Sequence, residues 1–171
     1  MRVILLGMSG SEQRATAERS GGRIGGIDCV FLTCFHSEFS FLALVLKYSG
    51  IRLHRADTLE EADFLLAVTG ATAFLTDVAF LDGSWCDALR MLSSSHPLVP
   101  PMVVADPADT PFLSDIYTYG ACGVLWKPFD TTCLIEVIRT AHQAARDRAL
   151  LLSEADFCYP HLPASASATL R

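Results

Sequence analysis

The sequence contains no long apolar run, and this absence excludes a membrane-spanning helix. The longest purely apolar stretches, such as residues 41–46, are only six residues long, whereas a helix that crosses a bilayer needs roughly 20. The apolar start at residues 3–6 is also shorter than the core of a secretory signal, about 7 to 15 residues. We therefore expect a cytoplasmic protein with no membrane partner.

Closely spaced cysteine pairs are also missing. The C-x-x-C spacing is typical of structural zinc sites and redox motifs, and we expect neither here. Unpaired cysteines usually behave as small buried hydrophobic residues, so we predict free, mostly buried thiols and no bound metal. We expect Cys34 to be buried as well, rather than redox-sensitive. The six cysteines are Cys29, Cys34, Cys86, Cys122, Cys133 and Cys158.

Positive charge is scarce in the body of the chain. Residues 28–147 hold 7 basic and 15 acidic residues, a net charge of −8, and the whole chain carries −6. Nucleic acids bind to basic patches that neutralise their phosphates. We therefore expect no nucleic-acid partner, and a protein partner fits the composition better.

The 171 residues suit one domain with a less ordered segment at each end. Residues 1–27 are rich in Gly, Ser and Arg and show no apolar period, so they predict a flexible leader. The domain is then expected over residues 28–147. Residues 148–171 predict a helix overhang followed by a disordered Pro-Ala-Ser tail, and the overhang is either a linker or dimer contact or a frayed end.

Short apolar runs alternate with helical stretches from residue 29 onward. Each run is four to six residues long and is separated from the next by turn residues and a helical stretch. This rhythm is typical of a parallel α/β sheet. The expected strands are Cys29–Cys34, Ile51–His54, Ala73–Asp77, Met102–Ala105 and Gly123–Trp126.

Three start signals place helices between and after these strands. Thr58, with Glu61 three residues later, has the spacing of a capping box. Thr110 is followed by a proline, which predicts a cap with proline at the first helical position, and Asp130 or the next residue can cap the last helix. The buried face of that last helix is predicted to contain Leu134, Ile138, Ala141 and Ala145.

Polar residues follow several of the expected strands. Thr33 and Cys34 end the first strand, Asp77 ends the third, and Lys127 follows the fifth. The carboxyl ends of parallel strands meet at one edge of a sheet, where ligands bind in such folds. We therefore expect Asp77 and Lys127 to converge at this edge.

These residues resemble the receiver domains of two-component response regulators over about residues 29–146. The resemblance is strongest in two segments, AFLTD, which ends at Asp77, and GACGVLWKPF, which contains Lys127. The spacing of 50 residues between the two side chains is close to that of the family. The resemblance implies a flavodoxin-like α/β fold, in which a five-stranded parallel sheet of order 2-1-3-4-5 has helices on both faces.

The resemblance also implies a mechanism. In the family, an aspartate accepts a phosphoryl group from a histidine kinase, an acidic pair after the first strand holds Mg²⁺, and a lysine pairs with the phosphoryl product. By position, Asp77 is the phosphoacceptor candidate and Lys127 is the phosphoryl partner. A static ion pair between these two side chains is the alternative role.

Three positions depart from the family pattern. Thr33 and Cys34 stand where the family has its acidic pair, and neither a hydroxyl nor a thiol supplies the anionic oxygen that Mg²⁺ prefers. Asp106, or Ala105 if the register shifts by one, stands at the Ser/Thr switch position, and Val124 replaces an aromatic residue that moves with that switch. We therefore expect weak Mg²⁺ binding at most and no other cofactor.

The function that we favour is a degenerate, stand-alone receiver-like module of phosphorelay signalling, not an enzyme. It would bind signalling proteins such as a histidine kinase or an effector, and it could also form a homodimer. One alternative is an ordinary receiver that is phosphorylated on Asp77. An alternative of another class is a flavodoxin-like carrier of a small ligand or cofactor, although residues 33–37 lack the glycine of a phosphate cradle.

Overall fold

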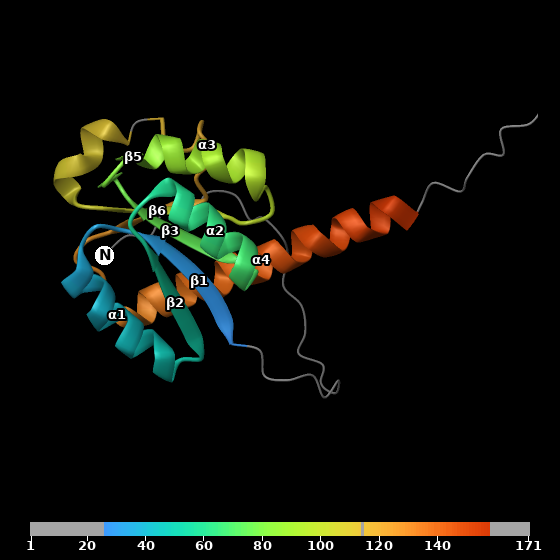
Figure 1. Ribbon diagram of the computed structural model, residues 1–171, viewed down its shortest axis with the longest axis horizontal. Helices are drawn as coiled ribbons and strands as arrows, with labels where there is room; N and C mark the ends of the chain where they lie inside the picture. The colour runs from blue at the N-terminus through green and yellow to red at the C-terminus, as the bar shows by residue number, and fades with distance from the viewer. Residues whose placement is uncertain (1–25, 114, 158–171) are drawn as a thin grey trace, which may run out of the picture.

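Five parallel strands form the central sheet of the computed structural model, which describes residues 26–113 and 115–157 (Figure 1). Their spatial order is β2-β1-β3-β6-β7, which confirms the predicted 2-1-3-4-5 order, because β4 (Ala79–Phe80) and β5 (Gly83–Ser84) form a separate small hairpin. The sheet strands are β1 (Ile27–Leu32), β2 (Ile51–Ala56), β3 (Ala73–Asp77), β6 (Pro101–Ala105) and β7 (Gly123–Trp126).

The first strand begins and ends two residues earlier than the sequence predicts. Ile27 already belongs to β1, and its N–H donates to the carbonyl of Gly50 at 3.0 Å. Of the predicted leader, residues 1–25 lie outside the described residues. At the other end, residues 148–157 are helical, and the predicted tail over 158–171 also lies outside the described residues.

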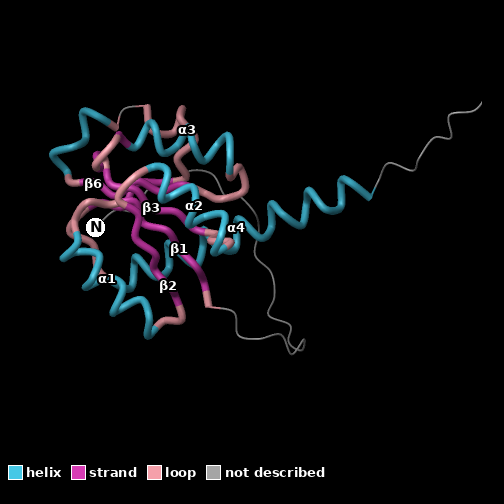
Figure 2. Tube along the Cα trace, viewed as in Figure 1, coloured by secondary structure: helices cyan, strands magenta, loops and turns pink. Residues whose placement is uncertain are grey.

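Helices cover both faces of the sheet, as predicted (Figure 2). In β1, Cys29 and Phe31 pack on one face against α1 (His36–Tyr48) and α4 (Thr131–Phe157). Val30 and Leu32 alternate with them and pack on the other face against α2 (Leu59–Thr69) and α3 (Trp85–Ser95). Because successive side chains of a strand point to opposite faces, an uninterrupted apolar run is buried on both sides.

The caps of α2 and α4 follow the sequence signals. Thr58 is the N-cap of α2, and its hydroxyl accepts from the N–H of Glu61 at 3.2 Å. The Glu61 carboxylate bonds the N–H of Asp57 at 3.0 Å rather than that of Thr58, so the predicted capping box is only half formed. Asp130 caps α4, because its carboxylate accepts from the N–H of Cys133 at 2.7 Å.

The prediction of a helix that starts after Thr110 is wrong. Residues Pro107–Phe112 form a 3-10 helix instead, with Asp106 at its N-cap, and Thr110 lies inside it. Pro111 has no N–H and cannot donate the i to i−4 bond of an α-helix. The chain then continues through turns to Gly120, whose φ of 91° is left-handed.

The last helix is longer than its buried face requires. The predicted face is confirmed, because Leu134, Ile138, Ala141 and Ala145 are buried. The helix has 27 residues and continues beyond Ala145 into solvent (Figure 1). Within the described residues, no helix is both long and apolar enough to cross a membrane.

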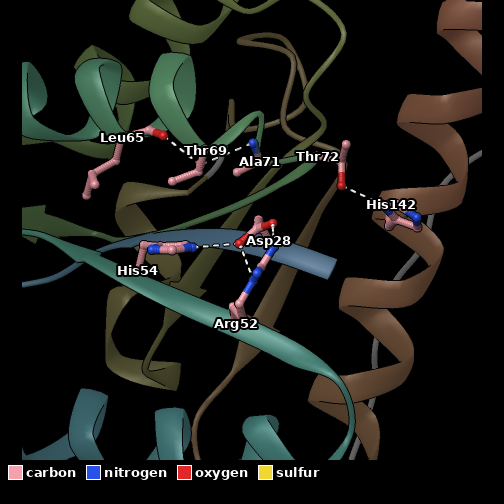
Figure 3. Close-up of polar contacts among 8 residues, drawn as sticks. All are labelled: Asp28, Arg52, His54, Leu65, Thr69, Ala71, Thr72 and His142. Atoms are coloured by element: carbon pink, nitrogen blue, oxygen red, sulfur yellow. Dashed lines mark hydrogen bonds and ion pairs between the residues drawn. The ribbon is translucent and has the colours of Figure 1, made fainter. Parts of the chain in front are cut away.

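Polar contacts attach the outer elements to the amino edge of the sheet (Figure 3). The carboxylate of Asp28 on β1 binds two groups of the edge strand β2, namely the Arg52 guanidinium and the His54 ring, the latter at 2.8 Å. The hydroxyl of Thr72, just before β3, contacts Nδ1 of His142 on α4 at 2.6 Å. Burial raises the pKa of Asp28, but the hydrogen bonds from Arg52 and His54 outweigh it and hold this pKa below its ordinary value.

We expect Asp28→Asn to lower the free energy of unfolding by about 1 kcal/mol at neutral pH. A carboxyl with a lowered folded-state pKa stabilises the fold above its unfolded pKa of 3.8, and this stabilisation is lost as the pH falls through the folded value. Urea unfolding at neutral pH and at about pH 3.5 measures this, with the exposed Asp147→Asn as control. A difference from the parent protein that does not shrink at the lower pH contradicts the expectation.

Candidate functional site

The carboxyl edge of the sheet brings together Asp77 and Lys127, as the sequence predicts. Asp77 ends β3 and is buried. Lys127 follows β7, and its backbone N–H donates to the carbonyl of Ala105 at 2.8 Å, which fixes its position beside β6. The Lys127 Nζ lies 3.2 Å from Asp77 Oδ1.

Thr33 belongs to the same group of side chains. It is fully buried, and its hydroxyl donates to Oδ2 of Asp77 and accepts from the N–H of Phe35 at 3.1 Å. Both carboxylate oxygens of Asp77 therefore have a partner, one neutral hydroxyl and one ammonium group.

Glu38 is the site residue that the sequence analysis missed. It lies in the first turn of α1, and its Oε2 is 2.8 Å from Lys127 Nζ, closer than the carboxylate of Asp77. The available signal was its place one turn into the helix that follows the first strand, since that turn faces the carboxyl edge of the sheet. The ammonium group thus joins α1 to β3, and it also lies 5.3 Å from the centroid of the Phe35 ring.

The pKa values of Asp77 and Lys127 are each set by burial and by the opposing effect of their partners. Burial raises the pKa of the Asp77 carboxyl above its ordinary value, and the hydrogen bonds from Thr33 and Lys127 offset this only in part. Burial lowers the pKa of Lys127, but the carboxylates of Glu38 and Asp77 outweigh it and hold that pKa above its ordinary value. The lysine is therefore charged at neutral pH, and it serves as the common counter-ion of two carboxylates.

Cys34 does not join the cluster, and the prediction that it is buried is wrong. Its side chain is exposed, because β1 ends at Leu32 and the chain bends at Cys34 before α1 begins. Among the described cysteines, Cys29 is buried and three others are partly exposed, so the prediction of mostly buried thiols is also wrong. Those three are Cys86, Cys122 and Cys133.

Two of the three expected switch positions, Ala105 and Asp106, line a pocket beside Asp77. Ala105 is buried at the end of β6, and Asp106 is exposed at the start of the 3-10 helix. Val124 is buried inside β7, next to Val103 of β6, and does not line the pocket. The pocket has a volume of about 220 Å³ and is lined by Phe35, Asp77, Val78, Ala79, Val104, Ala105, Asp106, Asp109 and Lys127.

The donor set of the cluster is mixed. It offers two carboxylates, a hydroxyl and an ammonium group, and the ammonium contacts both carboxylates. Over residues 26–113 and 115–157, no group of three or more His, Cys, Asp or Glu side chains is arranged to hold a metal ion. The single ammonium of Lys127 is therefore shared between two carboxylates, and with both of these ionised the cluster keeps one net negative charge.

No protein-family model and no curated protein matches the sequence. A response regulator receiver protein from Pseudomonas putida is 25% identical, with a TM-score of 0.60, and the match covers 67% of this chain and 96% of that one. A response regulator receiver domain protein from Clostridium thermocellum is 17% identical, with a TM-score of 0.64, over 72% and 98% of the two chains. An adenylate cyclase from Rhodopirellula baltica is 12% identical, with a TM-score of 0.62, over 76% and 95%.

These likenesses agree with the five-stranded parallel sheet and its strand order. At such low identity, the similarity to the cyclase concerns the fold alone. The matches to the two receiver structures cover nearly their full length. The chain therefore has the fold of a response regulator receiver domain.

Proposed function

We propose that this protein is a receiver-like module of two-component phosphorelay signalling that acts by binding other proteins, without Mg²⁺-dependent phosphorylation. Its partners would be signalling proteins of the cytoplasm, such as a histidine kinase or an effector, and it would carry out no catalytic turnover of its own. The observation that carries the proposal is the bridge from Lys127 to both Glu38 and Asp77. A lysine with two carboxylate partners is already neutralised and has less to gain from a phosphoryl group.

The residues present do not fit the Mg²⁺ ion of the family. Mg²⁺ binds through carboxylate oxygens in near-octahedral geometry, but Thr33 and Cys34 replace the acidic pair, and the hydroxyl of Thr33 is engaged with Asp77. Glu38 is not a substitute, because its carboxylate contacts the Lys127 ammonium. A cation placed here would have to displace that ammonium.

The switch positions support the same proposal. Ala105 has no hydroxyl with which to bind a phosphoryl group, and the Asp106 carboxylate would repel the nearly two negative charges of phosphoaspartate. Val124 is buried in the sheet at 5% exposure and lacks a ring that could change position. None of these three side chains could therefore respond to a phosphoryl group on Asp77 in the way that the family's switch residues do.

A protein-binding role is supported by apolar side chains that the fold leaves in solvent. On α1, Phe41, Leu44 and Tyr48 are exposed at 62%, 58% and 86%. Their spacing of three and four residues places them along one side of the helix, away from the buried Leu42 and Leu46. Such a row is typical of a surface that meets another protein.

The alternative, an ordinary receiver phosphorylated on Asp77, is favoured by one observation. The pocket of about 220 Å³ opens onto Asp77 and Lys127, so a small phosphodonor could approach the carboxylate. The experiments below separate this alternative from the proposal.

The charge bridge predicts unequal costs for its members. Lys127→Met leaves two carboxylates without their cation and is expected to lower the free energy of unfolding by about 3 kcal/mol. Asp77→Asn keeps the ion pair between Lys127 and Glu38 and removes a carboxylate whose ionised form burial disfavours. We therefore expect this variant to lower the free energy of unfolding by about 1 kcal/mol or less. The double variant should cost less than the sum of the two single ones.

Urea unfolding at neutral pH measures these losses, and Lys47→Met, which removes an exposed lysine at the end of α1, is the matched control. If Asp77→Asn costs as much as Lys127→Met, Glu38 is not the main partner of the lysine. Additive losses in the double variant would show that the two charges do not interact.

The missing acidic pair predicts no response to Mg²⁺. With low millimolar Mg²⁺ we expect no rise in melting temperature, because an ion stabilises a fold only by binding it. With Mg²⁺ and a small acyl phosphate we expect no phosphoryl mass increase on Asp77. A rise of several degrees, or a mass increase that Asp77→Asn abolishes, restores the ordinary receiver.

A gain-of-function variant makes this test decisive. Thr33→Asp combined with Cys34→Asp reinstates the acidic residues of the family at both positions, and the carboxylate at position 33 would lie beside Asp77. The melting temperature of this variant is therefore expected to rise with Mg²⁺ when that of the natural protein does not. A phosphorylatable receiver domain treated in parallel shows that the phosphodonor is active. Equal responses of the variant and the natural protein would show that the acidic pair is not what limits Mg²⁺ binding.

A further inference from the structure

The end of α4 extends past the body of the protein, and its buried contacts with the domain stop at Ala145. We call residues 146–157 the overhang, because the last buried side chain of the helix is Ala145. At 1.5 Å per residue these residues extend the helix by about 18 Å, and Figure 1 shows them leaving the domain as an isolated rod. Every side chain described from residue 146 to 153 is exposed.

Three consecutive leucines stand in the middle of the overhang. Leu150, Leu151 and Leu152 are exposed at 60%, 67% and 56%, and no core cluster of the described residues includes them. Since neighbouring residues of a helix are about 100° apart, the three side chains cover more than half of its circumference. A solitary helix with this much exposed apolar surface is better stabilised against a partner helix than in water.

The charges of the overhang are ordered about Leu151. Arg146 and Arg148 precede the leucines, whereas Glu154 and Asp156 follow them. Arg148 and Glu154 are each three residues from the centre, and Arg146 and Asp156 are each five residues from it. Asp147 also lies in the basic half, where it accepts a hydrogen bond from Gln143 of the same helix at 2.8 Å. Residues 146–150 still carry a net charge of +1 and residues 152–156 a net charge of −2, opposite in sign.

We propose that the overhang is a self-association surface on which two copies of this chain pair antiparallel, with Leu151 of each copy at the two-fold axis. In this arrangement the basic half of each helix lies beside the acidic half of the other. A parallel pair would place like charges side by side, which is unfavourable. The antiparallel pair is an isologous contact, the commonest form of closed dimer.

The base of the overhang adds surface to this contact. In the register centred on Leu151, residue 157 of one copy lies level with Ala145 of the other. A pocket of about 390 Å³ opens there, and Ala145, Arg146 and Ala149 line it together with the loop of residues 95–99. In this register the tip of each overhang therefore lies level with the partner's pocket.

The size of the contact sets its strength. Three leucines and one helix tip per copy bury less area than a standard interface of about 1,600 Å². The dimer is therefore weak and depends on protein concentration, with a dissociation constant on the order of 100 µM. Its formation does not rest on the state of Asp77, so its test is independent of the proposed function.

Sedimentation velocity over a concentration series tests the dimer. Leu151→Glu places an unpaired charge in the contact and is expected to raise the dissociation constant at least about tenfold. The matched control is Leu81→Glu, which adds the same charge at a leucine that is 73% exposed in the turn between β4 and β5, and it should leave the constant unchanged. A protein that stays monomeric up to about 500 µM, or equal effects of the two variants, overturns the proposal.

Cross-linking tests the orientation. In a background of Cys34→Ser and Cys158→Ser, one chain carries Asp147→Cys and a second, distinguishable by mass, carries Ala155→Cys. These positions are level with each other only in the antiparallel register, so a short bismaleimide should link unlike chains several times more than like chains. Preferential linking of like chains, or links equal to those of the background protein, overturns the antiparallel pairing.

Discussion

One ammonium group connects the elements that meet at the carboxyl edge of the sheet. Lys127 Nζ lies 2.8 Å from Glu38 on α1 and 3.2 Å from Asp77 at the end of β3, while its backbone is held beside β6. The Thr33 hydroxyl satisfies the remaining oxygen of Asp77. Because a partly buried carboxylate without a counter-charge is costly, this one cation reinforces the packing of α1 on the sheet, where Leu42 and Leu46 are buried in the core.

The same bridge bears on how the module would signal. In the family that the chain resembles, a lysine at this place meets a phosphoryl group. Here the lysine already has two carboxylate partners, and the neighbouring positions offer Thr33, Cys34 and Ala105 instead of acids and a hydroxyl. On our proposal, the receiver fold is kept as a scaffold whose rigidity comes from a closed charge cluster, and its signal is carried by surfaces that bind proteins.

Two apolar surfaces are left in solvent at different places on the fold. The row on α1 starts at Phe41 in the first half of the helix and ends at Tyr48, the last residue of the helix, close to the start of β2 at the amino edge of the sheet. The overhang leaves the domain from the amino edge, because α4 starts after β7 and runs back along the sheet before leaving it (Figure 1). The two surfaces thus belong to different helices, α1 for unlike partners and the end of α4 for the second copy that we propose.

The sequence by itself determined the five sheet strands, because continuous apolar runs of four to six residues are buried on both sides of a parallel sheet. It also determined that Asp77 and Lys127 lie at one edge of that sheet, because each directly ends or follows such a run. Only the tertiary structure decided which other side chains contact Asp77 and Lys127 at the site. Glu38 reaches Lys127 because α1 packs across the strand ends, and Cys34 is exposed because β1 ends two residues early. Thr110 lies inside a 3-10 helix for a local reason, since a proline follows it. The rest depends on distances between segments far apart in the chain, which periodicity and spacing along one sequence do not contain.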